Sequence, residues 1–190
     1  MPLRSATGTL LLALLGSCGG SASDAGSASL TGVLGFAANA EFAVVPPSVS
    51  GDNNSFPGTV IVVLAAISSP PSGQDLSALA CDSYYPAANG QPGPVEASQT
   101  LQVTAVPATG QMAAGETFLV VAPSDLDAGL ATITLNADGG HLFADGGSLT
   151  VGAVPSSDAG SYGGSLTAMI AGQQLSGTFS APYCASIEVD

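Results

Sequence analysis

Apolar and polar residues alternate with a period of two through the second half of the sequence, and this pattern limits the fold more than any other feature. Leu101, Val103 and Ala105 alternate with Gln102 and Thr104. An antiparallel strand with one face on a core and the other in water has this pattern. About eight or nine such short strands predict an all-β domain, an antiparallel β-sandwich or alternatively a closed β-barrel. Further alternating or apolar stretches lie at 118–121, 132–135, 149–151, 166–170 and 175–179.

Glycine and proline restrict the helical content. The chain has 25 Gly and 13 Pro, and in a helix interior each Gly costs about 1 kcal/mol and each Pro about 3 kcal/mol. Two Asp-Gly-Gly triplets, at 138–140 and 145–147, predict hairpin turns.

The most apolar stretch after residue 18 is 59–67, which reads Thr-Val-Ile-Val-Val-Leu-Ala-Ala-Ile. Its β-branched residues and modest length predict a strand that is buried on both faces and lies at the centre of the sheet. Residues 75–81 predict the one short helix, which Asp75 would cap and which would end near Cys81. The Pro, Gly and Asn residues of 84–94 predict a long loop.

The N-terminal segment has the layout of a secretion signal. Arg4 precedes the apolar run 10–15 and then small residues, and the run is too short for a bilayer span of about 20 residues. The sequence Leu15-Gly16-Ser17-Cys18 resembles the lipobox of bacterial lipoproteins, in which the signal is cut before a cysteine that carries lipid. The alternative is an ordinary signal peptide that is cut nearby.

The lipobox resemblance implies a domain organisation and a location. Residues 1–17 are then a signal peptide, residues 18–28 the lipidated cysteine and a flexible tether, and residues 29–190 a single β domain. The protein is then anchored by lipid on Cys18 in the cell envelope, at the outer membrane, on its periplasmic face or at the cell surface.

Charge excludes one class of partner. The chain has 14 acidic residues, all after Cys18, and its single basic residue is Arg4. Without the signal, no Lys or Arg is left to bind a phosphate backbone, so we expect no nucleic acid partner. Membrane attachment must then come from the acyl chains on Cys18, and an envelope protein or a polysaccharide remains as a partner.

Three cysteines are present. If Cys18 carries lipid, Cys81 and Cys184 remain as a pair in an oxidising compartment, which predicts a disulfide. The alternative is two unrelated buried thiols.

Candidate catalytic and metal-binding residues are few. His141 is the only histidine, and a hydrolase would have to use it, but its setting in a hairpin predicts a solvated turn residue; we therefore predict no catalytic residues. One His and two oxidised Cys do not suffice for zinc. Asp125 and Asp127 begin like an EF-hand loop, but Leu130 and Asn136 stand where that loop needs Gly and Glu. We predict no metal and no cofactor.

Tyr84 and Tyr85 form the one aromatic cluster that the sequence places in a loop. They are candidate ligand-binding residues, because exposed rings commonly line sugar sites. The alternative is that both rings pack over the helix beside Cys81.

The C-terminal stretch 175–184 resembles the closing strand of uncharacterised lipoproteins of myxobacteria. In those proteins a Val-rich strand leads to a Leu-rich turn and a Cys, as at 59–67 and 76–81 here. A Gly-Thr-aromatic strand follows, as at 115–118, and the chain ends on Gly-x-Phe-x-Ala-Pro-x-Cys, as at 177–184. The resemblance transfers no activity, but it supports the pairing of Cys81 with Cys184.

Together these features predict a non-enzymatic lipoprotein of the cell envelope with a structural or interaction role. The alternatives are a carbohydrate- or calcium-binding β module that uses Tyr84 and Tyr85, and, more remotely, a hydrolase that uses His141.

Overall fold

The computed structural model describes residues 27–32, 36–45, 56–69, 71–88, 96–137, 139–156 and 160–184. The signal segment and Cys18 lie outside these residues. The described part forms nine strands, one α-helix and one 3-10 turn. These are β1 (Ser27–Gly32), β2 (Ala40–Val44), β3 (Val60–Ile67), α1 (Leu76–Ala88), β4 (Ala97–Ala105), β5 (Thr117–Val120), η1 (Pro123–Asp125), β6 (Leu130–Ala137), β7 (Gly140–Ala153), β8 (Ser161–Ile170) and β9 (Gln173–Pro182).

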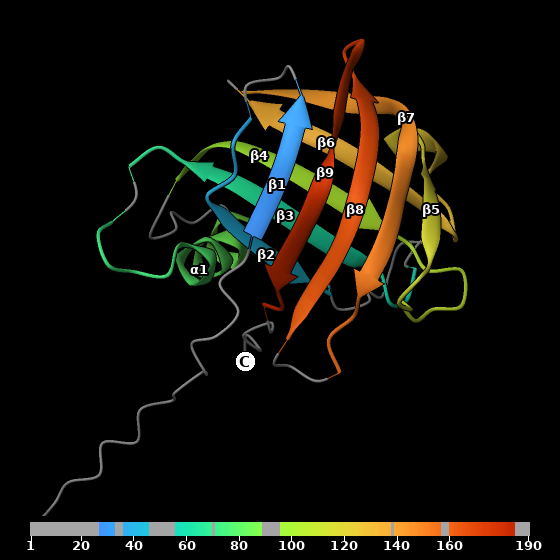
Figure 1. The fold of residues 1–190 in the computed structure, drawn as a ribbon, viewed down its shortest axis with the longest axis horizontal. Helices are drawn as coiled ribbons and strands as arrows, with labels where there is room; N and C mark the ends of the chain where they lie inside the picture. Colours follow the sequence, from blue (N-terminus) through green and yellow to red (C-terminus); the bar gives the residue numbers. More distant parts are fainter. Residues whose placement is uncertain are drawn as a thin grey trace, which may run out of the picture.

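All nine strands belong to one sheet, in the order β1-β9-β8-β7-β5-β6-β4-β3-β2. Neighbouring strands are antiparallel except β5 and β6, which are parallel. The sheet folds over, so that β1, β9, β8 and β7 cross in front of β2, β3, β4 and β6 (Figure 1). The all-β class with one short helix is confirmed, and the single sheet makes the barrel alternative the better description. Strand β1 begins at Ser27, inside the stretch that the sequence assigned to the tether.

The edge strand β2 meets the chain at the end of β9, close to the other edge strand, β1. Residues Ala43 of β2 and Tyr183, just after β9, form a parallel bridge, and the next backbone N–H, that of Cys184, donates to the carbonyl oxygen of Ala43 at 2.7 Å. These contacts bring β2 beside the end of β9, next to β1. The barrel is therefore nearly closed.

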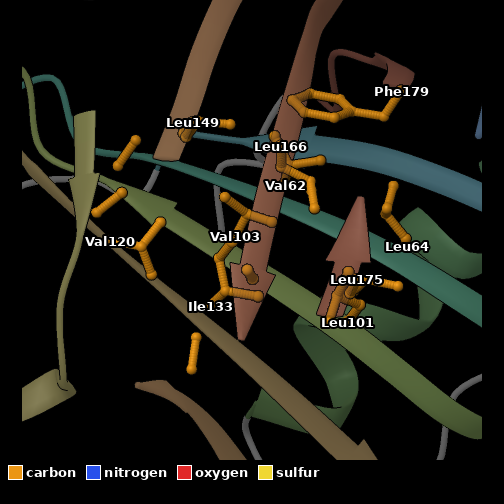
Figure 2. Close-up of a cluster of buried hydrophobic side chains, with 14 of the residues drawn as sticks. Val62, Leu64, Leu101, Val103, Val120, Ile133, Leu149, Leu166, Leu175 and Phe179 are labelled. Carbon is orange, nitrogen blue, oxygen red and sulfur yellow. The ribbon is translucent and has the colours of Figure 1, made fainter. Parts of the chain in front are cut away.

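Apolar side chains from both halves of the sheet fill the barrel (Figure 2). Leu101, Ile133 and Leu149 are among the largest side chains that are fully buried. The space left between Val62, Val103 and Phe179 amounts to about 10 Å³, roughly the room that one water needs. Because side chains occupy the interior, the outer surface is what the barrel offers to a partner.

A second apolar cluster lies outside the barrel, under α1. It joins Phe42 and Val63 of the sheet to Ala80 of the helix, and therefore β3 is buried on both faces, as its sequence predicts. The prediction that β3 lies at the centre of the sheet is wrong, because it stands second from the edge. The helix also continues to Ala88, through residues that were predicted to form a loop.

The start of α1 follows the predicted capping. The Oδ1 atom of Asp75 accepts hydrogen bonds from the backbone N–H groups of Ser77 and Ala78, at 2.9 and 3.3 Å. Such a cap satisfies amide groups that the first helical turn leaves without partners.

One predicted turn is wrong. The triplet Asp145-Gly146-Gly147 lies inside β7, where the register with β8 shifts between Ala144 and Gly146. Gly147 has φ +141, and a Cβ there would collide with the carbonyl oxygen of Thr167. The glycines thus permit a bulge that lets one long strand bend and pair with several neighbours.

Candidate binding surface

The outer surface of β4, β6 and β7 carries an ordered set of polar and aromatic side chains. The strand alternation turns Leu101, Val103, Ile133 and Leu135 into the core, so the residues between them point outward. Register aligns these outward residues in two rows across the three strands. The rows are Gln102–Thr134–Phe143 and Thr100–Asn136–His141, and we call these six residues the His141 face.

Side-chain hydrogen bonds join one row across all three strands. Asn136 Nδ2 donates to Thr100 Oγ1 at 2.9 Å, and this bond orients the amide so that its Oδ1 lies 2.6 Å from His141 Nδ1. With the amide in this orientation, Oδ1 can only accept, so His141 Nδ1 carries the hydrogen of this bond. The ring of His141 is thus held by Asn136 of β6, which is itself held by Thr100 of β4.

The two rings of the His141 face lie side by side on β7. Phe143 is 48% exposed, and His141 is also exposed. Their ring centroids are 6.5 Å apart and their planes differ by 18°. The two stacked rings are therefore exposed to water next to the amide and hydroxyl groups of β4 and β6.

Formal charge is absent from the two strands that carry the polar half of this face. Neither Ala97–Ala105 (β4) nor Leu130–Ala137 (β6) contains an ionisable side chain, while β7 adds His141 and Asp145. On the side away from β7, α1 covers the next strand through Val63 and Ala65. Thr100, Gln102, Thr134 and Asn136 thus form a polar strip without formal charge. It lies between α1 on one side and the rings of His141 and Phe143 on the other.

Of this face, the sequence singles out only His141 as a candidate. His141 was predicted as a turn residue, but it lies in β7 opposite Asn136. Asn136, Thr100 and Phe143 were missed as candidates. The alternation indicates that Asn136 points outward, but only the register of β6 with its neighbours shows what it meets.

The predicted disulfide is present. Cys81 of α1 is bonded to Cys184, with the Cα atoms 5.9 Å apart, within the usual range for such bridges. Tyr84 and Tyr85 belong to α1 rather than to a loop, and their side chains, like Cys18, lie outside what the structure describes.

The two acidic residues of the EF-hand-like stretch have local partners. Asp125 Oδ1 accepts from Ser124 Oγ at 3.2 Å, and Asp127 Oδ1 accepts from the backbone N–H of Ala128 at 2.7 Å. Within the described ranges, no group of three or more His, Cys, Asp or Glu could hold a metal ion.

Glu41 is a buried carboxyl group that the alternation did not predict. Phe42 and Val44 alternate in the sequence with Glu41 and Ala43, a pattern that would place Phe42 and Val44 in the core and Glu41 in water. Instead Phe42 and Val44 pack under α1, and Glu41 is 4% exposed. It pairs in register with the core residue Leu64 and so shares the inner face of the sheet. Burial raises the pKa of Glu41 above 4.5, although a hydrogen bond from the backbone of Ala28 in β1 opposes this rise.

Comparison with protein-family models, curated proteins and solved structures finds no match to this chain. Among the described residues, no helix is both long and apolar enough to cross a bilayer. Fold and surface define the class: a nearly closed β-barrel with a packed interior, a disulfide that joins its helix to a residue just after its last strand, and a polar strip without formal charge on the outside of β4 and β6.

Proposed function

We propose that this protein is a lipoprotein of the cell envelope, anchored through Cys18, which binds an envelope partner through the outer surface of its barrel and has no enzymatic role. The anchor is supported by the order of Arg4, the apolar run and the lipobox-like Leu15-Gly16-Ser17-Cys18. The interaction role is supported by the His141 face.

Chain length limits how far the barrel can stand from the anchor. Strand β1 begins at Ser27, nine residues after Cys18. Even a fully extended chain of this length reaches only about 30 Å. A partner must therefore meet the barrel close to the membrane that holds the lipid.

The observation that carries the interaction role is the hydrogen-bond chain from Thr100 through Asn136 to His141. Exposed side chains on a strand ordinarily lose rotamer freedom when they bind, which weakens binding by about 0.5 to 1.5 kcal/mol for each side chain that is immobilised. Here hydrogen bonds already restrict them. The face is therefore organised before any partner arrives.

Detergent-phase partitioning and intact mass test the anchor, with the full chain expressed in a bacterium and Cys18→Ser as the comparison. We expect the wild type to enter the detergent phase with added acyl mass and the variant to remain in water without it. If both proteins stay in water and carry no lipid, the protein is secreted free and the anchored role is wrong.

A further inference from the structure

We propose that the His141 face binds a neutral polysaccharide. This inference rests on the proposed function, because it names the partner that the same surface would meet in the envelope. It places the ligand on β4, β6 and β7 rather than on the helix that carries Tyr84 and Tyr85.

The ring pair supplies the apolar half of a sugar site. The C–H groups on one face of a pyranose ring form a flat, weakly apolar surface that packs against an aromatic ring. Phe143 and His141 lie nearly parallel, with centroids 6.5 Å apart, and Phe143 leaves about half of its surface, 48%, in water.

The polar half lies directly beside the rings. Thr134 is the register partner of Phe143, and Asn136 is that of His141; Gln102 extends the first row on β4. Asn136 has a second N–H beyond the one given to Thr100, and hydroxyl and amide groups both donate and accept. Adjacent strands are about 4.8 Å apart, so these groups lie within reach of the hydroxyls of a sugar that is stacked on the rings.

Charge selects a neutral polymer over an anionic one. The chain carries a net charge of −13, and β4 and β6 contribute only neutral side chains to the face. A uronate, sulfate or phosphate polymer would be repelled by the whole protein and would find no Lys or Arg to pair with in the described strands. A neutral glycan avoids this repulsion and can use the hydrogen-bonding capacity that remains beyond the bonds within the strip.

Affinity electrophoresis tests the proposal with the full chain, purified in detergent. The gels contain a β-glucan, an α-glucan or a galactomannan as neutral probes, and alginate or polygalacturonate as anionic probes. We expect at least one neutral polysaccharide to retard the wild type and neither anionic one to do so. The proposal is overturned if only the anionic polymers retard the protein, or if none of the neutral polymers does.

Variants assign the binding to the His141 face. We expect Phe143→Ala and Asn136→Ala to weaken binding about fivefold or more, as the loss of a central contact typically does. Met169→Ala is the matched control, since it removes a side chain that is 40% exposed on β8, outside the face, and it should bind like the wild type. Equal binding by Phe143→Ala and the wild type, with both folded by circular dichroism, contradicts the proposal.

Cys18→Ser separates this inference from the proposed anchor. The variant should lose lipid and still bind the neutral polysaccharide, because the face lies on the barrel. A lipidated protein that binds none of the neutral probes overturns the glycan site alone, whereas an unlipidated protein that binds them overturns the anchor alone.

Discussion

The backbone N–H of Cys184 donates to the carbonyl oxygen of Ala43 at 2.7 Å, while the side chain of Cys184 is bonded to Cys81 of α1. One residue thus attaches the last strand both to the edge strand β2 and to the helix that covers it. The nearly closed barrel and the outer apolar cluster meet at this residue.

Removing the disulfide should destabilise this closure. The bridge spans 103 residues, for which the chain-entropy model gives about 4 to 5 kcal/mol of stabilisation, with measured values often lower. We expect the double variant Cys81→Ser/Cys184→Ser to lower the free energy of unfolding by up to this amount. Chemical denaturation with and without reductant measures this free energy. The prediction would be contradicted if reductant destabilised the double variant as much as it destabilises the wild type.

Glu41 should make stability depend on pH. Burial raises its pKa in the folded state above 4.5, so its contribution to stability is fully present below pH 4.5 and is lost as the pH rises through the raised folded pKa. We expect Glu41→Gln to remove this loss and to be more stable than the wild type at neutral pH. Thermal unfolding from pH 4 to pH 8 measures the difference.

Glu96→Gln is the control for Glu41→Gln, because it makes the same change in net charge at an exposed position. Its stability profile should run parallel to that of the wild type. A rise in stability at neutral pH of the same size in both variants would assign the effect to net charge rather than to burial.

Two neighbouring residues of β5 test which side of the strand faces the core. Phe118 is 0% exposed and Leu119 is 61% exposed. We expect Phe118→Ala to cost about 3 to 5 kcal/mol, through lost burial and the cavity left behind, and Leu119→Ala to change stability by less than about 0.5 kcal/mol. Equal effects in urea denaturation would show that the strand is turned differently.

Gly164 leaves room for the ring of Phe179 inside the barrel. A Cβ at this position would lie 2.6 Å from the carbonyl oxygen of Thr150 and 2.8 Å from Phe179 Cζ. Gly164→Ala should therefore cost about 1 to 3 kcal/mol, as overpacking does. At Gly152 the nearest atom is 3.8 Å away, so Gly152→Ala should leave the thermal midpoint unchanged or raise it, and a larger loss there than at Gly164 would contradict the packing.

The candidate surface was only partly predictable. His141 stood out because it is the only histidine, but its partner Asn136 lies on β6, and Thr100, which bonds Asn136, lies on β4. Tyr84 and Tyr85 were assigned to a loop because Pro and Gly residues follow them, whereas the structure continues α1 to Ala88. The local Pro and Gly content favours a loop, but the packing of the helix on β2 and β3 favours its continuation.

What the sequence by itself determined is local: alternation specified the strands, Asp75 marked the helix start, and the count of cysteines indicated the bridge. Tertiary structure alone decided that the strands form one sheet, that Glu41 is buried, and that His141 meets Asn136. The physical reason is register, since a shift of one residue turns a whole strand over. The register of each strand is decided by the neighbouring strands and by the helix that packs on the sheet. These neighbours come from distant parts of the sequence, so no short stretch of sequence specifies the register.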